Sequence, residues 1–227
     1  MAIEQVQARL LDSCEIAPEV RHFVFETPGI NLVYRAGQFL MLYASIQGRR
    51  VRRAYSLASA PRPGRFELCL NRVREGIFSP YLFDLKPGAR VEFRGPYGAF
   101  GWRPEPAESL LIATGTGVAP FRAMLEERRD RPATLLFGVR HEYGILYREE
   151  FARRAGPGFR FWPTLTRPGP SWSGRTGRVQ QHVEAALGGR GDVDVYICGL
   201  WEMVVEVRRM LAGLGIDRKR VVYERYD

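Results

Sequence analysis

Short stretches of alternating apolar and polar residues fill the first part of the chain. In Phe66–Asn71 the alternation runs the whole length, as in a β-strand with one buried face. Similar stretches predict strands at Gln38–Tyr43, Arg53–Leu57 and Arg90–Arg94, whereas Ser79–Leu85 predicts one or two helical turns. Pro-Gly and Ala-Gly pairs mark turns between the stretches. Short strands with such regular turns predict an antiparallel barrel.

The pattern changes after the proline-rich segment Trp102–Pro106, which we interpret as a linker between two domains. Beyond it, apolar runs of strand length alternate with stretches of helical periodicity. The predicted strands are Leu110–Ala113, Thr134–Val139, Arg160–Leu165, Val193–Cys198 and Val221–Tyr223. The predicted helices are Phe121–Arg129, Arg148–Arg154, Val179–Leu187 and Glu202–Ala212. This alternation predicts a mostly parallel sheet with helices on both faces, whose ligands bind beyond the carboxyl ends of the strands.

The composition narrows the class of protein. No apolar run reaches the roughly 18 residues of a membrane-spanning helix, so no membrane insertion is expected. The stretch Met1–Asp12 lacks the basic and apolar blocks of a secretory signal, which favours a cytoplasmic enzyme. Three cysteines, Cys14, Cys69 and Cys198, are too few for a two-iron cluster, so an iron–sulfur partner is expected to be another chain. The histidines show no metal-ligand spacing, and no metal site is predicted.

The net charge is +9, and arginine supplies nearly all of the positive charge, since the lysines are Lys86 and Lys219. Such a balance suits nucleic acids, phosphorylated ligands or an acidic protein partner. The arginines are scattered, and no helix-turn-helix, zinc-finger or aromatic RNA-binding motif accompanies them, which argues against nucleic acid. We therefore expect phosphate-bearing cofactors and an acidic partner.

The segment Thr114–Pro120 follows an apolar strand and opens a helix. Its first four residues, Thr114, Gly115, Thr116 and Gly117, include glycines that let a backbone approach a diphosphate, and the helix start supplies free N–H groups. The third glycine of the usual dinucleotide fingerprint is absent. Taken alone, the segment fits a diphosphate cradle and an ordinary strand-to-helix turn about equally.

Two other segments carry groups suited to a flavin nucleotide. Arg53-Ala54-Tyr55-Ser56 sets a guanidinium, an aromatic ring and a hydroxyl along a strand, with Arg53 and Tyr55 on one face. Guanidinium groups bind phosphate bidentately, tyrosine rings stack on flat heterocycles, and serine can hydrogen-bond a ring nitrogen. Gly76-Ile77-Phe78-Ser79 places a glycine and a serine at a short helix start, a second candidate anion site. Taken singly, each is more often an ordinary strand or helix cap.

These segments together resemble the ferredoxin–NADP reductase family, and the resemblance covers nearly the whole chain. Arg53–Ser56 matches the family's Arg-x-Tyr-Ser flavin motif, and Gly76–Ser79 matches its Gly-x-x-Ser segment. Gly95–Gly98 matches the segment that closes the flavin domain, and Thr114–Pro120 the pyridine-dinucleotide turn. Cys198-Gly199 matches the Cys-Gly pair beside the nicotinamide. The resemblance implies a six-stranded antiparallel β-barrel that binds FAD, followed by an α/β NAD(P)-binding domain with a five-stranded parallel sheet.

The resemblance also implies domain limits, 1–103 for the flavin domain and 104–227 for the nucleotide domain, and a role for each matching residue. Arg53 would pair with the flavin phosphates, Tyr55 would pack against the isoalloxazine, and Ser56 would hydrogen-bond near flavin N5. Gly76 and Ser79 would offer backbone and hydroxyl donors to the diphosphate. Cys198 would press the nicotinamide against the flavin, although a lone cysteine is more commonly a small buried apolar residue.

The C-terminal segment Tyr223–Asp227 resembles family endings of the form Glu-x-aromatic. Tyr226 would cover the flavin face that the nicotinamide must reach, and Glu224 would serve a proton relay. One residue follows the tyrosine here, which leaves open how tightly Tyr226 stacks. A frayed tail is the alternative, above all for Asp227.

Arginines at loop positions bear on the choice of nicotinamide. NADPH carries a 2′-phosphate that NADH lacks, so an enzyme that prefers NADPH needs cations beside it. Arg140, Arg167 and Arg178 fall where bacterial NADP-dependent members of the family place theirs, and Arg175 lies nearby. Since no acidic residue stands out as a ribose clamp for NADH, the sequence favours NADP(H).

The resemblance thus implies an FAD-dependent oxidoreductase that moves hydride between NADPH and the flavin and single electrons to or from an acidic carrier, a ferredoxin or flavodoxin. Its catalytic residues would be Ser56, Cys198, Glu224 and Tyr226. The nearest alternatives are an NAD(P)H:flavin reductase and the reductase component of an oxygenase. A non-catalytic regulatory or nucleic-acid-binding module is supported by the net charge alone. The carrier, the direction of electron flow and the oligomeric state are left open.

Overall fold

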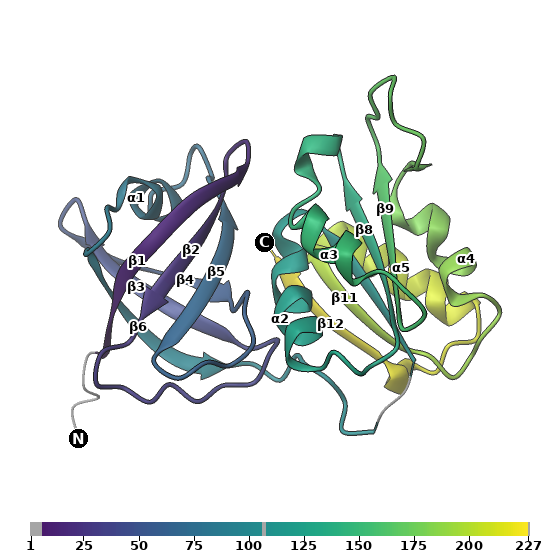
Figure 1. The fold of residues 1–227 in the computed structure, drawn as a ribbon, viewed down its shortest axis with the longest axis horizontal. Helices are drawn as coiled ribbons and strands as arrows, with labels where there is room; N and C mark the ends of the chain where they lie inside the picture. The colour runs from purple at the N-terminus through teal and green to yellow at the C-terminus, as the bar shows by residue number, and fades with distance from the viewer. Residues whose placement is uncertain (1–5, 106–107, 227) are drawn as a thin grey trace. The chain divides into compact units, whose positions relative to one another are not determined.

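The computed structural model describes residues 6–105 and 108–226 and divides into two compact units (Figure 1). The first unit contains the residues up to Trp102 together with Arg122–Glu127, which form most of helix α2 (Ala119–Glu127). The second contains Arg103–Phe121 and the residues from Arg128 onward. Within the described ranges, no helix has the length and apolar character that crossing a membrane requires.

The first unit is a six-stranded antiparallel sheet in the order β4-β3-β6-β1-β2-β5. An isolated antiparallel bridge between Leu57 and Leu68 joins the chain beyond β4 to β5, so the two edges of the sheet meet and form a barrel. Its elements are β1 (Val6–Ala17), β2 (Val20–Glu26), β3 (Phe39–Ile46), β4 (Arg49–Ser56), β5 (Arg65–Asn71), β6 (Arg90–Tyr97) and helix α1 (Phe78–Asp84). The predicted antiparallel barrel is confirmed.

In the first unit, the sequence pattern did not predict strands β1 and β2. The pairing of β1 with β2 shifts register between Leu10 and Asp12 and again between Glu15 and Ala17. Each shift moves the following side chains to the other face of the sheet, so the apolar and polar residues do not keep a period of two. The irregular pairing therefore hides the longest strand of the barrel from pattern analysis.

Strand β5 is buried on both faces, so the prediction of a single buried face is wrong. Phe66 and Leu68 point into the barrel core, as expected. Glu67 and Cys69, on the opposite face, are nevertheless only 6% exposed. The side chain of Arg122 in helix α2 contacts Glu67 from that side, and the pattern within one strand cannot reveal such a cover.

The second unit is a parallel sheet in the order β10-β9-β8-β7-β11-β12, with helices on both faces, as predicted. Five strands correspond to predicted ones, and the two-residue β10 adds an edge strand. The strands are β7 (Ser109–Thr114), β8 (Ala133–Val139), β9 (Phe159–Leu165), β10 (Arg175–Thr176), β11 (Asp194–Leu200) and β12 (Val221–Tyr226). The remaining helices are α3 (Arg148–Arg154), α4 (Val183–Leu187) and α5 (Trp201–Gly213), and short 3-10 turns include η1 (Gly115–Val118) and η3 (Val179–His182).

Alternating residues of the central strands supply two apolar layers. Leu110 and Ile112 of β7 belong to the core that contains α4 and α5. On the other face, the ring of Phe151 in α3 packs 5.4 Å from Phe161 and 6.3 Å from Phe159 in β9, measured between ring centroids. Strand β12 continues through Tyr226, so the tail up to that residue is part of the sheet, whereas Asp227 lies outside the described residues.

Candidate functional site

Strand β4 carries Arg53 and Tyr55 on one face, as the sequence predicts. The residues of β3 that pair with them are Leu42 and Leu40, and both leucines belong to the barrel core. Arg53 is exposed and donates one hydrogen bond, from Nη1 to the Arg52 carbonyl oxygen at 2.7 Å. A guanidinium has further N–H groups, so Arg53 keeps donors for a phosphate.

Tyr55 brings the two predicted flavin segments together within the first unit. Its ring lies 6.1 Å from that of Phe78, the first residue of α1. Burial raises the pKa of the Tyr55 hydroxyl, which therefore stays protonated at neutral pH. Ala54 is exposed between Arg53 and Tyr55, and Ser56 is 7% exposed.

The loop before α1 is closed by its own serine. The Val73 N–H donates to Ser79 Oγ at 2.9 Å, and the Gly76 N–H donates to the Val73 carbonyl at the same distance. Ser79 is buried, and its oxygen already accepts the hydrogen bond from the Val73 N–H. Its hydroxyl group can still donate a hydrogen bond. Ile77 occupies the N-cap, and its apolar side chain leaves the first N–H groups of α1 to another acceptor. These donors and the Tyr55 ring fit a flavin diphosphate and its ring system.

The turn at the end of β7 interlocks with the turn at the end of β11. A side chain on Gly117 would collide with the Cys198 carbonyl oxygen, and one on Gly199 would collide with Thr114 Oγ1. Gly199 also has φ +154°, a conformation that favours glycine. The structure thus brings two predicted nucleotide segments together, with Gly115 open to solvent beside them.

Thr114 carries a hydroxyl group that no described residue hydrogen-bonds. Among the described residues, Thr114 Oγ1 is buried and has no hydrogen-bond partner. Buried hydroxyl groups in folded proteins are nearly always hydrogen-bonded, so an orphaned one needs an explanation. A dinucleotide at the carboxyl end of β7 would offer acceptors at this position, and the residues therefore fit that cofactor.

Cys198 lies within β11 opposite Glu224, and Leu200 lies opposite Tyr226 in the same pairing. Burial raises the pKa of the Cys198 thiol well above its ordinary value, nearby Glu224 raises it further, and a hydrogen bond from Tyr226 lowers it only in part. The thiol is therefore neutral at physiological pH and is not a thiolate nucleophile. The structure brings the predicted residues Cys198, Glu224 and Tyr226 together in the second unit.

Three of the four arginines predicted near the 2′-phosphate are exposed in the loops that follow β8, β9 and β10. The Arg167 N–H donates to the Arg140 carbonyl at 2.8 Å, which joins the loops after β8 and β9. Arg178 occupies the N-cap of η3. Arg175 differs, because its guanidinium carbon lies 3.7 Å from the centre of the Trp162 ring, and partial burial lowers its pKa. Arg175 packs on tryptophan and is the least available of the four.

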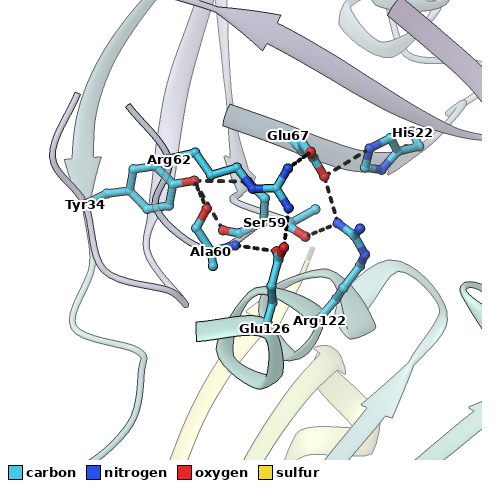
Figure 2. Close-up of polar contacts among 9 residues, drawn as sticks. His22, Tyr34, Ser59, Ala60, Arg62, Glu67, Arg122 and Glu126 are labelled. Carbon is cyan, nitrogen blue, oxygen red and sulfur yellow. Dashed lines mark hydrogen bonds and ion pairs between the residues drawn. The ribbon is translucent and has the colours of Figure 1, made fainter. Parts of the chain in front are cut away.

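The sequence pattern did not predict a polar network that surrounds Glu67 of β5 and the chain that follows β4 (Figure 2). Glu67 accepts a hydrogen bond from Arg122 Nη1 at 2.8 Å and lies 3.3 Å from His22 Nε2. Burial by itself would raise the pKa of Glu67, but the hydrogen bonds from His22 and Arg122 outweigh it and lower the pKa to about 2. Glu67 takes a polar place in the alternating pattern of β5, so no local signal in the sequence points to this network.

Comparisons with known proteins agree with this geometry. An oxidoreductase FAD-binding domain family matches residues 7–102, and an oxidoreductase NAD-binding domain family matches residues 111–209. Ferredoxin–NADP reductase B of Sorangium cellulosum (strain So ce56) is 44% identical over 240 residues, which cover 99% of this chain and 98% of that protein.

Two further proteins are similar over most of this chain. The toluate 1,2-dioxygenase electron transfer component of Pseudomonas putida is 32% identical, over 86% of this chain and 60% of that protein. The crystal structure of Amycolatopsis cytochrome P450 reductase GcoB superposes with a TM-score of 0.88 at 29% identity, over 98% of this chain and 69% of that one. The chain therefore belongs to the ferredoxin–NADP reductase family and is an FAD- and NAD(P)-binding oxidoreductase.

Proposed function

We propose that this oxidoreductase exchanges reducing equivalents between NADPH and a ferredoxin or flavodoxin. The flavin domain would comprise residues 1–103 and the nucleotide domain residues 104–227. The observation that carries the proposal is the 44% identity to a ferredoxin–NADP reductase over nearly the full length of both chains.

Each of the side chains described above would have one role in binding or reacting with the cofactors. FAD, when bound, supplies the exchange between two-electron hydride transfer and one-electron chemistry. Arg53 and the first N–H groups of α1 bind its diphosphate, while Tyr55 packs on its ring system and Ser56 hydrogen-bonds it. Thr114–Gly117 binds the dinucleotide diphosphate. Cys198 presents an uncharged thiol to the nicotinamide, and Tyr226 and Glu224 lie beside it.

An anaerobic titration of the purified protein tests this function. We expect a yellow protein whose flavin absorbance bleaches with NADPH at a much lower concentration than with NADH. A colourless protein that reduces only added free flavin would instead be an NAD(P)H:flavin reductase. Bleaching without subsequent reduction of a ferredoxin or flavodoxin would favour the reductase component of an oxygenase.

Cys198→Ala is expected to slow hydride transfer by about tenfold while FAD stays bound, because a smaller side chain positions the nicotinamide less well. Stopped-flow reduction of the flavin by NADPH measures the rate, and the flavin-to-protein absorbance ratio measures FAD content. Cys69→Ala, in the barrel, is the matched control for loss of a buried thiol. An unchanged rate would make Cys198 a packing residue only.

Replacing Arg167 and Arg178 together with alanine is expected to lower the preference for NADPH over NADH by about tenfold or more, since each guanidinium supplies charge-assisted hydrogen bonds to a phosphate. Steady-state kcat/KM with each nucleotide measures the preference. Arg153→Ala with Arg209→Ala removes the same charge from exposed positions on α3 and α5 and serves as control. If the double variant keeps the NADPH/NADH ratio, the 2′-phosphate is bound elsewhere.

An acidic electron carrier suits the +9 net charge of the chain. Opposite charges accelerate encounter, and dissolved salt screens them over about 10 Å at 0.1 M. Reduction of a ferredoxin by the NADPH-reduced enzyme should therefore slow by about tenfold between low and moderate ionic strength. A rate that does not depend on salt would remove the electrostatic part of this proposal.

A further inference from the structure

The segment that follows the flavin motif is held from several sides. Ser56 ends β4, and the chain continues through Leu57, Ala58, Ser59 and Ala60. The Leu57 N–H donates to the Gln38 carbonyl at 2.9 Å, and the Ala58 N–H donates to the Glu67 carbonyl at 2.8 Å. These backbone bonds tie one side of the segment to the barrel and leave its carbonyl groups to other donors.

Tyr34 contacts the far end of the segment. Its hydroxyl donates to the Ala60 carbonyl at 2.8 Å and lies 3.0 Å from Ser59 Oγ (Figure 2). Burial raises the pKa of the Tyr34 hydroxyl to about 12, so it remains a donor throughout the neutral range. The end of the segment is thereby fixed within the barrel.

Helix α2 reaches the same segment with two side chains one helical turn apart. Arg122 Nη1 donates to the Ala58 carbonyl at 2.7 Å and to Glu67 Oε2 at 2.8 Å. Glu126 Oε2 accepts from the Ala60 N–H at 2.9 Å, and its other oxygen pairs with Arg62. Residues separated by four positions lie on one face of a helix, so both contacts come from a single surface of α2 (Figure 2).

The same helix begins at the dinucleotide turn. Gly115–Val118 forms the 3-10 turn η1, and α2 follows at once from Ala119. Within the first unit, Arg122 and Glu126 of this helix contact the chain that leaves the proposed flavin motif. The contact is polar, directional and only partly exposed, so it sets a position more sharply than apolar packing does.

We propose that Arg122 is a positioning residue for hydride transfer, which holds the Leu57–Ala60 segment and thereby Ser56 in register with the flavin. This inference rests on the proposed flavin site at Arg53–Ser56. Arg122 would act through the Ala58 carbonyl, which lies two residues beyond Ser56. A small displacement of a positioned group is enough to slow a reaction strongly, about a hundredfold for 1 Å.

Arg122 has a second role besides its hydrogen bond to the Ala58 carbonyl, and the experiment must separate the two roles. It is also a counter-ion of the buried Glu67, so removing it leaves a buried carboxylate with one partner fewer. A slow variant could thus reflect a disturbed charge balance and not the lost bond to Ala58. Neutralising Glu67 in the same chain removes that ambiguity.

The experiment compares Arg122→Lys, Arg122→Met, and the double variant Arg122→Met/Glu67→Gln, each as FAD-loaded full chain. Stopped-flow reduction by NADPH gives the hydride-transfer rate, and the flavin absorbance spectrum and midpoint potential report the flavin environment. Arg129→Met, an exposed arginine just beyond α2, is the control for charge. We expect Arg122→Met to slow transfer at least about tenfold and shift the flavin spectrum. Arg122→Lys, with one compact cation for two acceptors, should recover part of the rate.

The double variant decides between the two roles. If Arg122 positions the segment, the double variant regains thermal stability but stays slow, because the Ala58 carbonyl still lacks its donor. A double variant or an Arg122→Met variant with the rate and spectrum of Arg129→Met would overturn the proposal. If wild-type protein and Arg129→Met themselves show no flavin reduction, it is the proposed function that fails.

Discussion

Arg53→Ala is expected to purify as largely colourless protein with its barrel intact. The guanidinium is exposed at the first position of the flavin motif. Within residues 6–105 and 108–226 its hydrogen bond goes to the Arg52 carbonyl, which leaves further N–H groups for a phosphate. A bidentate charge-assisted pair with a phosphate contributes about 3 kcal/mol. Its loss corresponds to more than about a hundredfold in the FAD dissociation constant.

The flavin-to-protein absorbance ratio after gel filtration measures this effect, and far-UV circular dichroism checks the barrel. Arg49→Ala is a suitable control, since Arg49 is an exposed arginine at the other end of the same strand. Arg53→Ala with a full complement of FAD would assign the diphosphate to other donors, and the first turn of α1 would be the next place to look.

Where the sequence pattern is regular, it predicts the fold well. Leu110–Ala113 is apolar throughout, and Thr134–Val139 has one polar residue, because β7 and β8 are buried on both faces. Both predicted strands fall within one residue of the observed ones. Gly117 and Gly199 are informative for a related reason. Each sits where a side chain would collide with the neighbouring turn, so the residue type itself reports the close approach.

The polar network around Glu67 could not be predicted in the same way. Its members come from β2, β5, α2 and the loop after β4, and no local pattern links them. In the sequence, Arg122 follows the dinucleotide turn and cannot be told apart from a solvent-facing helix residue. Only the folded structure shows that it contacts Ala58. Glu67 fits an alternating strand pattern equally well whether the outer face of β5 contacts water or, as here, the guanidinium of Arg122. Such long-range partners are set by tertiary structure, which local periodicity does not encode.

Glu67→Gln is expected to destabilise the first unit by about 3 kcal/mol, because it removes the charge that His22 and Arg122 share in a site with little solvent. Urea unfolding followed by circular dichroism measures the change in the free energy of unfolding. Glu75→Gln, at an exposed position in the loop before α1, is the control. A change below about 0.5 kcal/mol, the usual range for surface substitutions, would contradict a structural role for the carboxylate.

The pH dependence of stability gives this prediction a second, independent readout. The pKa of Glu67 is lowered from 4.5 to about 2 in the folded protein, so the folded state holds the proton less tightly than the unfolded chain. Its stabilising contribution is therefore complete above about pH 4.5 and is lost as the pH falls toward 2. Wild-type protein should lose stability over this window more steeply than Glu67→Gln, while the two curves run parallel above it. Equal slopes below pH 4.5 would mean that His22 and Arg122 do not hold the carboxylate ionised. The contacts of Glu67 in Figure 2 would then add no electrostatic stabilisation to the folded state.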